Sequence, residues 1–245
     1  MIPSQVPRTE AVRRALPRRS LAFAVGLAAV VTGCSDGTVV IRGTGSIVQE
    51  RRQLRHTDEI VLFGELDVVV RLVPASHEAT GGTAETVVWI EGASDLIDHV
   101  RTIPHGSSLH VDYRDGVRLD PLPTIEIQCS RIRVLSARGT GTVRISDLGI
   151  GLRPGESCEI EARGTLDIRA SGEVETLVLR QMGAADLHFA DVIAGTVDHG
   201  SIGNGDAWIH ATDLVVTSIV GAGDLFVTGT ATIEESIAGS GQVHR

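Results

Sequence analysis

A turn motif that recurs at nearly constant spacing constrains the fold of this 245-residue chain more than any other feature. The motif is Gly-x-x-Asp or Gly-x-Gly-Asp followed by alternating apolar residues, and its leading glycines lie 20, 18 and 18 residues apart. The four clearest copies begin at Gly183, Gly203, Gly221 and Gly239. Internal repeats with one or two strands each are typical of solenoids. The sequence therefore predicts an all-β fold, a parallel β-helix or β-solenoid with about 18–20 residues per coil.

Diverged copies extend the motif toward the N-terminus, at Gly64, Gly139 and Gly164. An antiparallel β-sandwich also alternates strands and turns, but it does not require one motif in the same phase in successive repeats. In each repeat, two alternate residues after the turn should point inward. All ten are apolar: Val143 and Ile145, Leu166 and Ile168, Leu187 and Phe189, Ala207 and Ile209, Leu225 and Val227. A second inward column is expected six residues before each glycine, at Cys158, Leu177, Val197, Val215 and Ile233.

Residues 1–33 are expected to be a signal peptide that precedes the fold. Arginines lead into an apolar stretch from Leu21 to Val31, which is too short to span a bilayer. The stretch ends in Val31-Thr32-Gly33-Cys34, which is similar to a bacterial lipobox, so Cys34 is the predicted lipid-attachment site. Two alternatives stay open: an ordinary signal peptide in which Cys34 is incidental, and a twin-arginine signal at Arg18-Arg19. The sequence predicts export and, through the lipid, anchoring to a membrane of the cell envelope.

The rest of the chain is predicted to hold a short tether, residues 34–40, and one domain, residues 41–245. The regular copies of the motif occupy residues 121–245. Residues 41–120 are less regular, and we expect them to form the first, irregular coils of the same solenoid.

Several short segments follow one another in a characteristic order along residues 41–245. They are Gly43-Thr44-Gly45, Asp58-Glu59-Ile60, Asp67-Val68-Val69-Val70, Trp89-Ile90-Glu91-Gly92, Ser108-Leu109-His110-Val111 and the repeated glycine turns. In this order of features the chain resembles the head GIN domain family of bacterial auto-transporter adhesins. The resemblance implies a β-helical fold and an exported or lipid-anchored envelope protein. It brings no established activity and no catalytic residues.

Three aspartates of the repeat, Asp186, Asp206 and Asp224, should stack in one column with like charges about 5 Å apart. One hypothesis is a calcium ladder, because hard cations take carboxylate oxygens and calcium-binding β-rolls use a related glycine–aspartate turn. Those rolls, however, have a period of about nine residues. The alternative is that each carboxylate caps its own turn through backbone N–H groups, with Thr142, Thr165 and Gln242 in the same column. No cofactor is predicted.

Outward positions beside the aspartates read Arg144, Asp167, His188, Trp208, Phe226 and His244. Aromatic residues make up only 3% of the chain, so two of them on one exposed column are unexpected. The residues His188, Trp208, Phe226 and His244 are therefore a candidate ligand face for a cell-surface glycan or protein. The alternative is cross-strand stacking that stabilises the sheet.

The cysteines and histidines do not form a metal-ligand pattern. Cys129 and Cys158 are either bridged, as an exported protein allows, or buried as free thiols. His188, His199 and His210 are 11 residues apart, which places successive ones on different faces, and all are expected at the surface.

A net charge of −9 disfavours nucleic-acid binding, and no familiar catalytic motif is present. The leading hypothesis is a non-catalytic, lipid-anchored envelope protein that presents a β-solenoid face for adhesion or ligand binding. A self-assembling structural module, a homo-oligomer, is the second, because the last repeat runs to Arg245 without a polar cap. The third is a polysaccharide-active enzyme that uses the aspartate column.

Overall fold

The computed structural model describes residues 11–14, 39–74, 85–114 and 116–245. Cys34 and the rest of the predicted signal peptide and tether therefore lie outside the described residues, apart from β1 (Ala11–Arg14) and residues 39–40, and their roles stay predictions. The described chain is almost entirely β-strand, with one short helix, α1 (Ser94–Ile97), which confirms the all-β class. No helix in the described ranges has the length and apolar character that a membrane span requires.

The first strands of the domain form a mixed sheet. In chain order they are β2 (Val39–Arg42), β3 (Ile47–Leu54), β4 (Glu59–Leu72), β5 (Thr86–Ala93), β6 (Val100–His105), β7 (Ser108–Tyr113), β8 (Val117–Asp120) and β9 (Thr124–Cys129). Strand β4 pairs in parallel with β7 and β9, whereas β5 pairs antiparallel with β3 and β9, and β6 with β7. Strands β2 and β8 form a separate two-stranded sheet, and β1 pairs antiparallel with β3.

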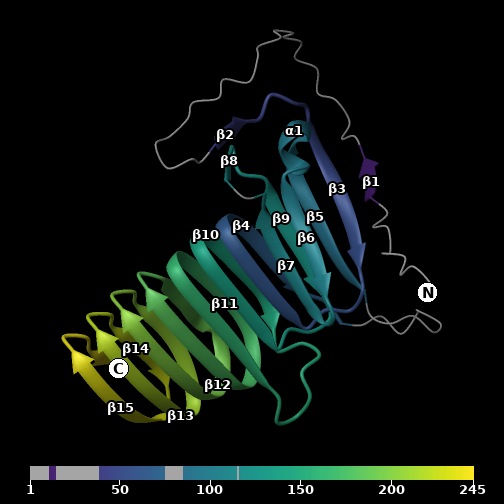
Figure 1. Cartoon of the computed structure of the whole chain (residues 1–245). Helices are drawn as coiled ribbons and strands as arrows, with labels where there is room; N and C mark the ends of the chain where they lie inside the picture. Colours follow the sequence, from purple (N-terminus) through teal and green to yellow (C-terminus); the bar gives the residue numbers. More distant parts are fainter. Residues whose placement is uncertain (1–10, 15–38, 75–84, 115) are drawn as a thin grey trace, which may run out of the picture.

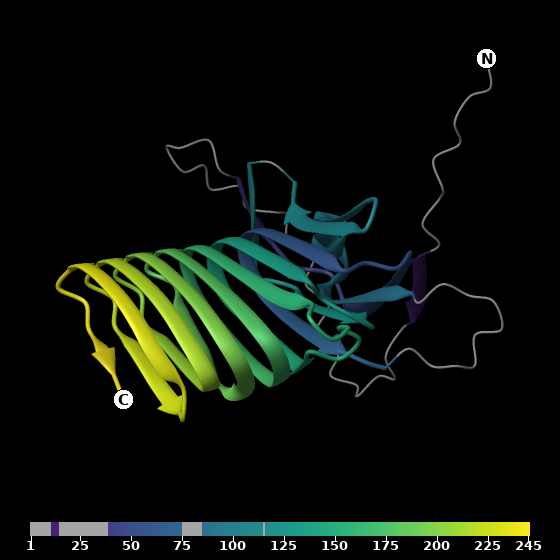
Figure 2. The same cartoon turned by 90° about the horizontal axis from the view of Figure 1, so that it is seen from below.

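From β10 onward every pairing is parallel. These strands are β10 (Val134–Leu148), β11 (Ser157–Gly183), β12 (Asp186–Gly203), β13 (Ala207–Gly221), β14 (Leu225–Gly229), β15 (Thr232–Gly239) and β16 (Val243–His244). Figures 1 and 2 show them as successive curved ribbons, stacked from the green β10 to the yellow C-terminus. The N-terminal mixed region lies at the other end of this stack (Figure 2).

The corners of the stack are made by the motif glycines, which pair with one another from strand to strand. Gly139 pairs with Gly64 and Gly164, and Gly183 pairs with Gly203, which in turn pairs with Gly221. Gly203 has a φ of 138°, and a Cβ at this position would overlap the carbonyl oxygen of Gly183. Only glycine combines this backbone conformation with such a close approach, so the repeat of glycine in the sequence fixes the register.

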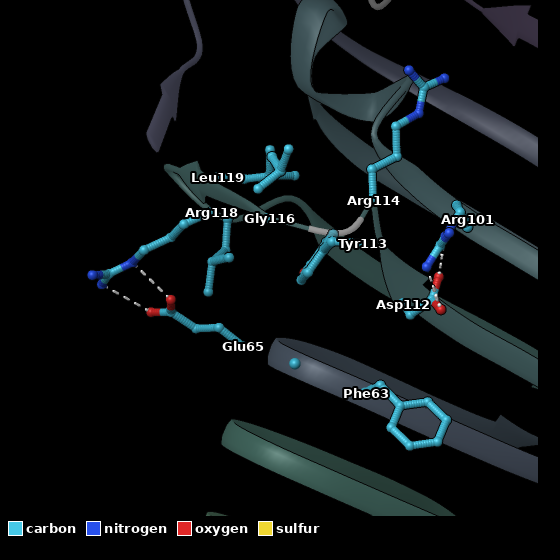
Figure 3. Close-up of a pocket in the computed structure, with 12 residues that line it drawn as sticks. Phe63, Glu65, Arg101, Asp112, Tyr113, Arg114, Gly116, Arg118 and Leu119 are labelled. Atoms are coloured by element: carbon cyan, nitrogen blue, oxygen red, sulfur yellow. Dashed lines mark hydrogen bonds and ion pairs between the residues drawn. The ribbon is translucent and has the colours of Figure 1, made fainter. Parts of the chain in front are cut away.

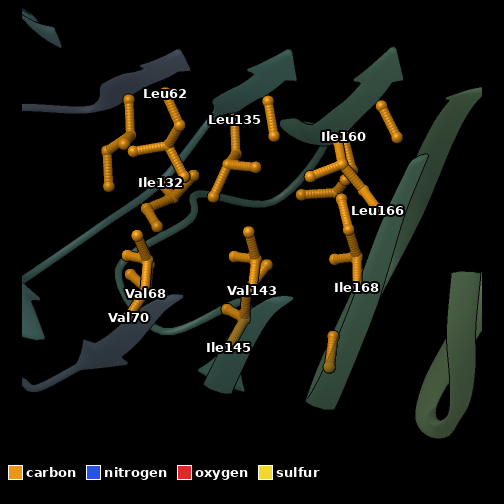
Figure 4. Close-up of a cluster of buried hydrophobic side chains, with 14 of the residues drawn as sticks. Leu62, Val68, Val70, Ile132, Leu135, Val143, Ile145, Ile160, Leu166 and Ile168 are labelled. Carbon is orange, nitrogen blue, oxygen red and sulfur yellow. The ribbon is translucent and has the colours of Figure 1, made fainter. Parts of the chain in front are cut away.

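The core lies between the two halves of each long strand. Figure 4 shows Leu135 and Ile160 in one layer pointing toward Val143 and Ile168 in the other. All ten residues predicted to point inward are buried, and so is the second inward column as far as Val215. Ile233, in the last repeat, is only partly buried. Burial of these large apolar side chains, each contributing about 2 kcal/mol before chain entropy is subtracted, holds the layers together.

One part of the predicted register is wrong. Asp167 pairs with Thr142 and Asp186 and so belongs to the aspartate column, where the sequence analysis placed Thr165. Arg169, not Asp167, pairs with His188. The error is a shift of two residues, which preserves the alternation of inward and outward side chains. The hydrophobic pattern alone therefore could not reveal this two-residue error. The spacing from the corner glycine does, because Thr142, Asp167 and Asp186 each lie three residues after such a glycine.

The two cysteines of the core are free thiols. Cys129 and Cys158 are both buried and unbridged, which confirms the second of the two alternatives. Burial raises the pKa of each thiol to about 12, so both stay protonated at neutral pH.

His199 is buried, so its predicted place at the surface is wrong. It is 2% exposed and points inward, in a column that reads Leu179, His199, Thr217 and Glu235 from strand to strand. Its Nδ1 lies 2.9 Å from the Thr217 hydroxyl, and its Nε2 lies 3.3 Å from the Gln181 side-chain oxygen. Burial lowers the pKa of His199 to about 4, and the nearby Arg180 acts in the same direction. The imidazole is therefore neutral at physiological pH, and its hydrogen bonds offset the cost of burying it.

Candidate binding surfaces on the C-terminal strands

The predicted aspartates form a hydrogen-bonded column along the stack. The backbone N–H of Asp206 donates to Asp186 Oδ1 at 3.0 Å, and that of Asp224 donates to Asp206 Oδ1 at 2.8 Å. The N–H of Gln242 donates in the same way to Asp224 Oδ1, also at 2.8 Å. Each carboxylate thus caps the turn of the following repeat. The capping role was predicted, but for the residue's own turn.

Polar and basic partners stabilise the charge of several carboxylates in this column. Arg169 donates two hydrogen bonds of 2.9 Å to Asp167, and this contact lowers the pKa of Asp167. At the other end, His244 Nε2 lies 3.1 Å from Asp224 Oδ2, and this contact and the Gln242 N–H lower the pKa of Asp224. These contacts offset part of the repulsion between the stacked carboxylates. Among the described residues, no group of three or more His, Cys, Asp or Glu side chains is arranged to hold a metal ion.

The four residues of the predicted ligand face form a continuous column of stacked rings. His188 and Trp208 lie 4.5 Å apart between ring centroids, Trp208 and Phe226 5.2 Å, and Phe226 and His244 4.6 Å. The angles between neighbouring ring planes are 9°, 5° and 13°, so the rings stack face to face. Because the faces lie against one another, the column presents mainly ring edges to solvent. This geometry matches the cross-strand stacking alternative and limits the stacking of a sugar on these rings.

A second column, which sequence analysis missed, is apolar and more exposed. Met182 pairs with Ile202, and Ile202 pairs with Val220, on neighbouring parallel strands. Their exposed fractions are 38%, 54% and 48%. These residues stand directly before the corner glycines, whereas the rings follow the turns, so the two columns lie on different outer faces. The signal in the sequence was a large apolar residue immediately before Gly183, Gly203 and Gly221.

The apolar column borders a shallow pocket. Gly200 and Ser218 lie beside the column and leave a space of about 290 Å³ over the strands. Toward the N-terminal side, the lining changes to Arg163 and Arg180, which pair with Glu161 and Asp198 respectively. The pocket therefore has one apolar side, formed by the column, and one polar side that includes the two ion pairs.

These features define a class of protein: an all-β chain built on a long parallel stack, with columns of like side chains on its outer faces. A family model described as "Putative auto-transporter adhesin, head GIN domain" matches residues 58–231. The chain belongs to this family, as the sequence resemblance predicted.

The chain is also similar to solved structures. A structure titled as a putative adhesin from Bacteroides fragilis has a TM-score of 0.57 and 16% identity, covering 83% of this chain and 99% of that one. This similarity shows the fold. A structure titled as a putative adhesin from Parabacteroides merdae has a TM-score of 0.44 and 15% identity, covering 84% of this chain and 98% of that one. Among curated proteins, no relative matches the chain.

Proposed function

We propose that this chain is an exported envelope protein, anchored by lipid at Cys34, whose parallel stack is a β-solenoid with an adhesive outer face. Membership in a family described as adhesins supports the adhesive role. The parallel register, with like residues about 18–20 positions apart, supports the solenoid. The lipobox-like Val31-Thr32-Gly33-Cys34 supports the anchor.

The observation that carries the proposal is the exposed apolar column of Met182, Ile202 and Val220. Outward strand positions facing water are usually polar, and aligned large apolar side chains on rigid strands are costly to leave in solvent. Exposed patches of this kind mark surfaces that bind a partner. The column therefore supplies the apolar centre of the adhesive contact, and the ion-paired arginines at its end supply a polar rim.

The ring column is a second surface for adhesion. Its half-buried edges include the N–H groups of His188, Trp208 and His244, and the aspartate column runs beside it. Such an array of donors and carboxylate acceptors suits the hydroxyl groups of a glycan lying across the strands. A protein partner on the apolar column and a glycan on the ring column are compatible, since the columns occupy different faces.

A non-catalytic role agrees with the state of the carboxylates. A glycosidase needs one carboxyl group with a raised pKa as general acid. The pKa of Asp224 is instead lowered, by the hydrogen bond from His244 and then by the Gln242 N–H. Asp186 and Asp206 each accept a backbone N–H, a structural task that fixes their orientation.

Self-assembly through the end of the stack is disfavoured by the last full strand. Among the described residues β15 pairs with β13 alone, and it carries the adjacent exposed residues Glu234 and Glu235. Glu235 occupies the inward column, where β11 has Leu179. An inward-pointing charge on an edge strand is a device that prevents edge-to-edge pairing. Glu234 and Glu235 thus make this edge of β15 polar.

The adhesive proposal is tested with cells that display the full chain. The Ile202→Thr/Val220→Thr variant keeps β-branched residues on both strands, so the fold is preserved while the apolar column is lost. We expect adhesion to cells or matrix to fall several-fold. Ile193→Thr is the matched control, because Ile193 is 51% exposed on β12 but lies outside the column. Equal adhesion by the double variant and the wild type would show that the apolar column does not contribute to adhesion.

The anchor has its own test. Incorporation of radiolabelled palmitate into the full chain should be abolished by Cys34→Ala and unaffected by Cys158→Ala, because Cys158 is buried. Release of the Cys34→Ala protein into the medium would complete the evidence. Label that persists in the Cys34→Ala variant would contradict lipid attachment at this residue.

A further inference from the structure

A cavity in the N-terminal region is built from residues that the adhesive faces do not use. It lies between the corner of β4 at Gly64, the end of β7 and the strand β8, and it has a volume of about 480 Å³. This size is within the range of small-molecule sites in proteins. Figure 3 shows its lining, with Tyr113 among the other residues. The cavity is thus separate from the parallel stack from β11 onward.

Two ion pairs flank the cavity. Arg101 donates to both oxygens of Asp112, at 2.7 and 2.9 Å. Arg118 pairs with Glu65, with its Nε 2.9 Å from one carboxylate oxygen and a terminal nitrogen 3.3 Å from the other. Figure 3 shows these pairs on opposite sides of Tyr113. Within each pair the charges cancel, so the walls offer donors and acceptors without a strong net field. This balance favours a neutral, polar ligand over an ion.

Tyr113 lies between the pairs and has an unused hydroxyl group. The residue is 9% exposed, and its buried hydroxyl oxygen has no hydrogen-bond partner among the described residues. Burial raises the pKa of this phenol, and Glu65 and Asp67 act in the same direction, so the hydroxyl stays protonated as a donor. A buried polar group without a partner is destabilising, and its persistence in a native fold calls for an explanation. A ligand that hydrogen-bonds to the hydroxyl provides one.

The remaining lining is apolar. Phe63, Leu119 and Leu122 line the cavity, together with Val117. Arg114 also contributes, but Figure 3 shows its guanidinium extending away from Tyr113. A sugar ring has an apolar C–H face and a rim of neutral hydroxyl groups. It therefore matches a cavity that combines apolar walls, paired donors and acceptors and one unused phenol.

We propose that this cavity binds one neutral sugar residue, with the Tyr113 hydroxyl and the Glu65–Arg118 pair contacting its hydroxyl groups. The proposal rests on the adhesive function, for which it names a ligand class. The sugar is either a free monosaccharide or the terminal residue of a surface glycan. Because Gly64 marks the first corner of the repeat motif, the site lies where the mixed region meets the stack.

The test is saturation-transfer NMR on the full chain with glucose, galactose, mannose and N-acetylglucosamine, each alone and as the terminal residue of an oligosaccharide. We expect at least one neutral sugar to bind in the millimolar range. Tyr113→Phe removes a single hydroxyl and should weaken binding about tenfold. The same variant should melt at the wild-type temperature or higher, because it removes an unpartnered buried polar group. Glu65→Gln should also weaken binding, and its melting curve shows whether the fold is intact.

The possible outcomes separate this site from the adhesive faces. Binding of the oligosaccharides but not of the free sugars supports a glycan end as the ligand, and the reverse supports a free monosaccharide. Binding that is unchanged by Tyr113→Phe overturns the site. The absence of binding to any neutral sugar also overturns it, while the loss of adhesion in Ile202→Thr/Val220→Thr still supports the adhesive column. In another outcome, the double variant adheres normally while sugar binding is weakened by Tyr113→Phe. This result contradicts the adhesive role of the apolar column and supports the sugar site.

Discussion

In the strands from β10 onward, one type of hydrogen bond to a carboxylate recurs from repeat to repeat, whereas in the strands before them each carboxylate makes its own set of contacts. In the stack, each aspartate of the column accepts the same N–H from the next repeat. In the mixed region, Asp95 accepts the N–H groups of Thr44 and Gly45, and Asp58 holds two arginines. Among the described residues, buried side-chain atoms without hydrogen-bond partners lie there at Thr86, His99, Ser108 and Tyr113, and in the stack at Ser201. The repeated contacts give the stack uniform outer faces, whereas the irregular strands of the mixed region leave the cavity beside Tyr113.

The two ends of the sheet differ as well. On its N-terminal side, β4 is covered by β7 and β9. On the C-terminal side, β15 relies on charge, through Glu234 and Glu235. One side of the sheet is thus covered by strands, and β15 on the other side carries carboxylates that disfavour edge pairing.

The largest effect is expected at a corner of the stack. Gly203→Ala places a Cβ against the carbonyl oxygen of Gly183 at a φ of 138°, so it should destabilise the fold by more than about 4 kcal/mol. Gly106→Ala is the control in the mixed region, because a Cβ there meets nothing within 4 Å. It should cost about 1 kcal/mol through its positive φ alone. Urea unfolding measures both. Equal losses would mean that the corners are not tightly stacked.

The next effect concerns a side-chain contact between the mixed region and the stack, which are also joined by the parallel pairing of β4 with β10. Asp58 is nearly buried and pairs with Arg131 and Arg133, on the segment leading into β10, at 2.9 and 2.8 Å. Asp58→Asn removes the charge that both guanidinium groups contact, while Arg131 keeps Glu156 at 3.6 Å, and it should cost about 2–3 kcal/mol. Asp167→Asn breaks an exposed pair with Arg169 and should cost about 1 kcal/mol or less. A small loss for Asp58→Asn would show that the pairing of β4 with β10 holds the two regions together without this ion pair.

A pH effect is expected from His199 in the stack. Its folded pKa of about 4 lies below the ordinary value of 6.5, so the unfolded chain binds the proton more readily. The unfolding free energy should therefore be constant above pH 6.5 and fall by about 3 kcal/mol as the pH drops from 6.5 to 4. His199→Gln removes the titrating group and should flatten this part of the profile. A variant profile with the wild-type slope would assign the effect to other groups.

The smallest effect is expected in the ring column. Trp208 stacks on both His188 and Phe226, so Trp208→Ala should cost about 2 kcal/mol, measured by thermal unfolding. His188→Ala removes one stacking contact and should cost about half as much. If both variants kept wild-type stability, the column would serve binding alone.

Sequence reasoning was most successful where the repeat is regular. The glycine period predicted the all-β class, the ten buried positions and the four stacked rings, because each follows from the register of one motif. It failed at His199, because an inward column that changes from Leu179 to His199 looks in sequence like a surface position. It gave no hint of the Tyr113 cavity, whose walls come from β4, β7 and β8 and depend on how irregular strands cross.

The central claim is that side chains about 18 positions apart form one continuous outer face. The most direct test is the electron paramagnetic resonance spectrum of the full chain with spin labels at Ile202→Cys and Val220→Cys in a Cys34→Ala background. Neighbouring parallel strands lie about 4.8 Å apart, so we predict a strongly broadened spectrum for this pair. A pair labelled at Ile47→Cys and Val220→Cys, on β3 and β13, should give narrow lines. Narrow lines from the 202/220 pair would contradict the account.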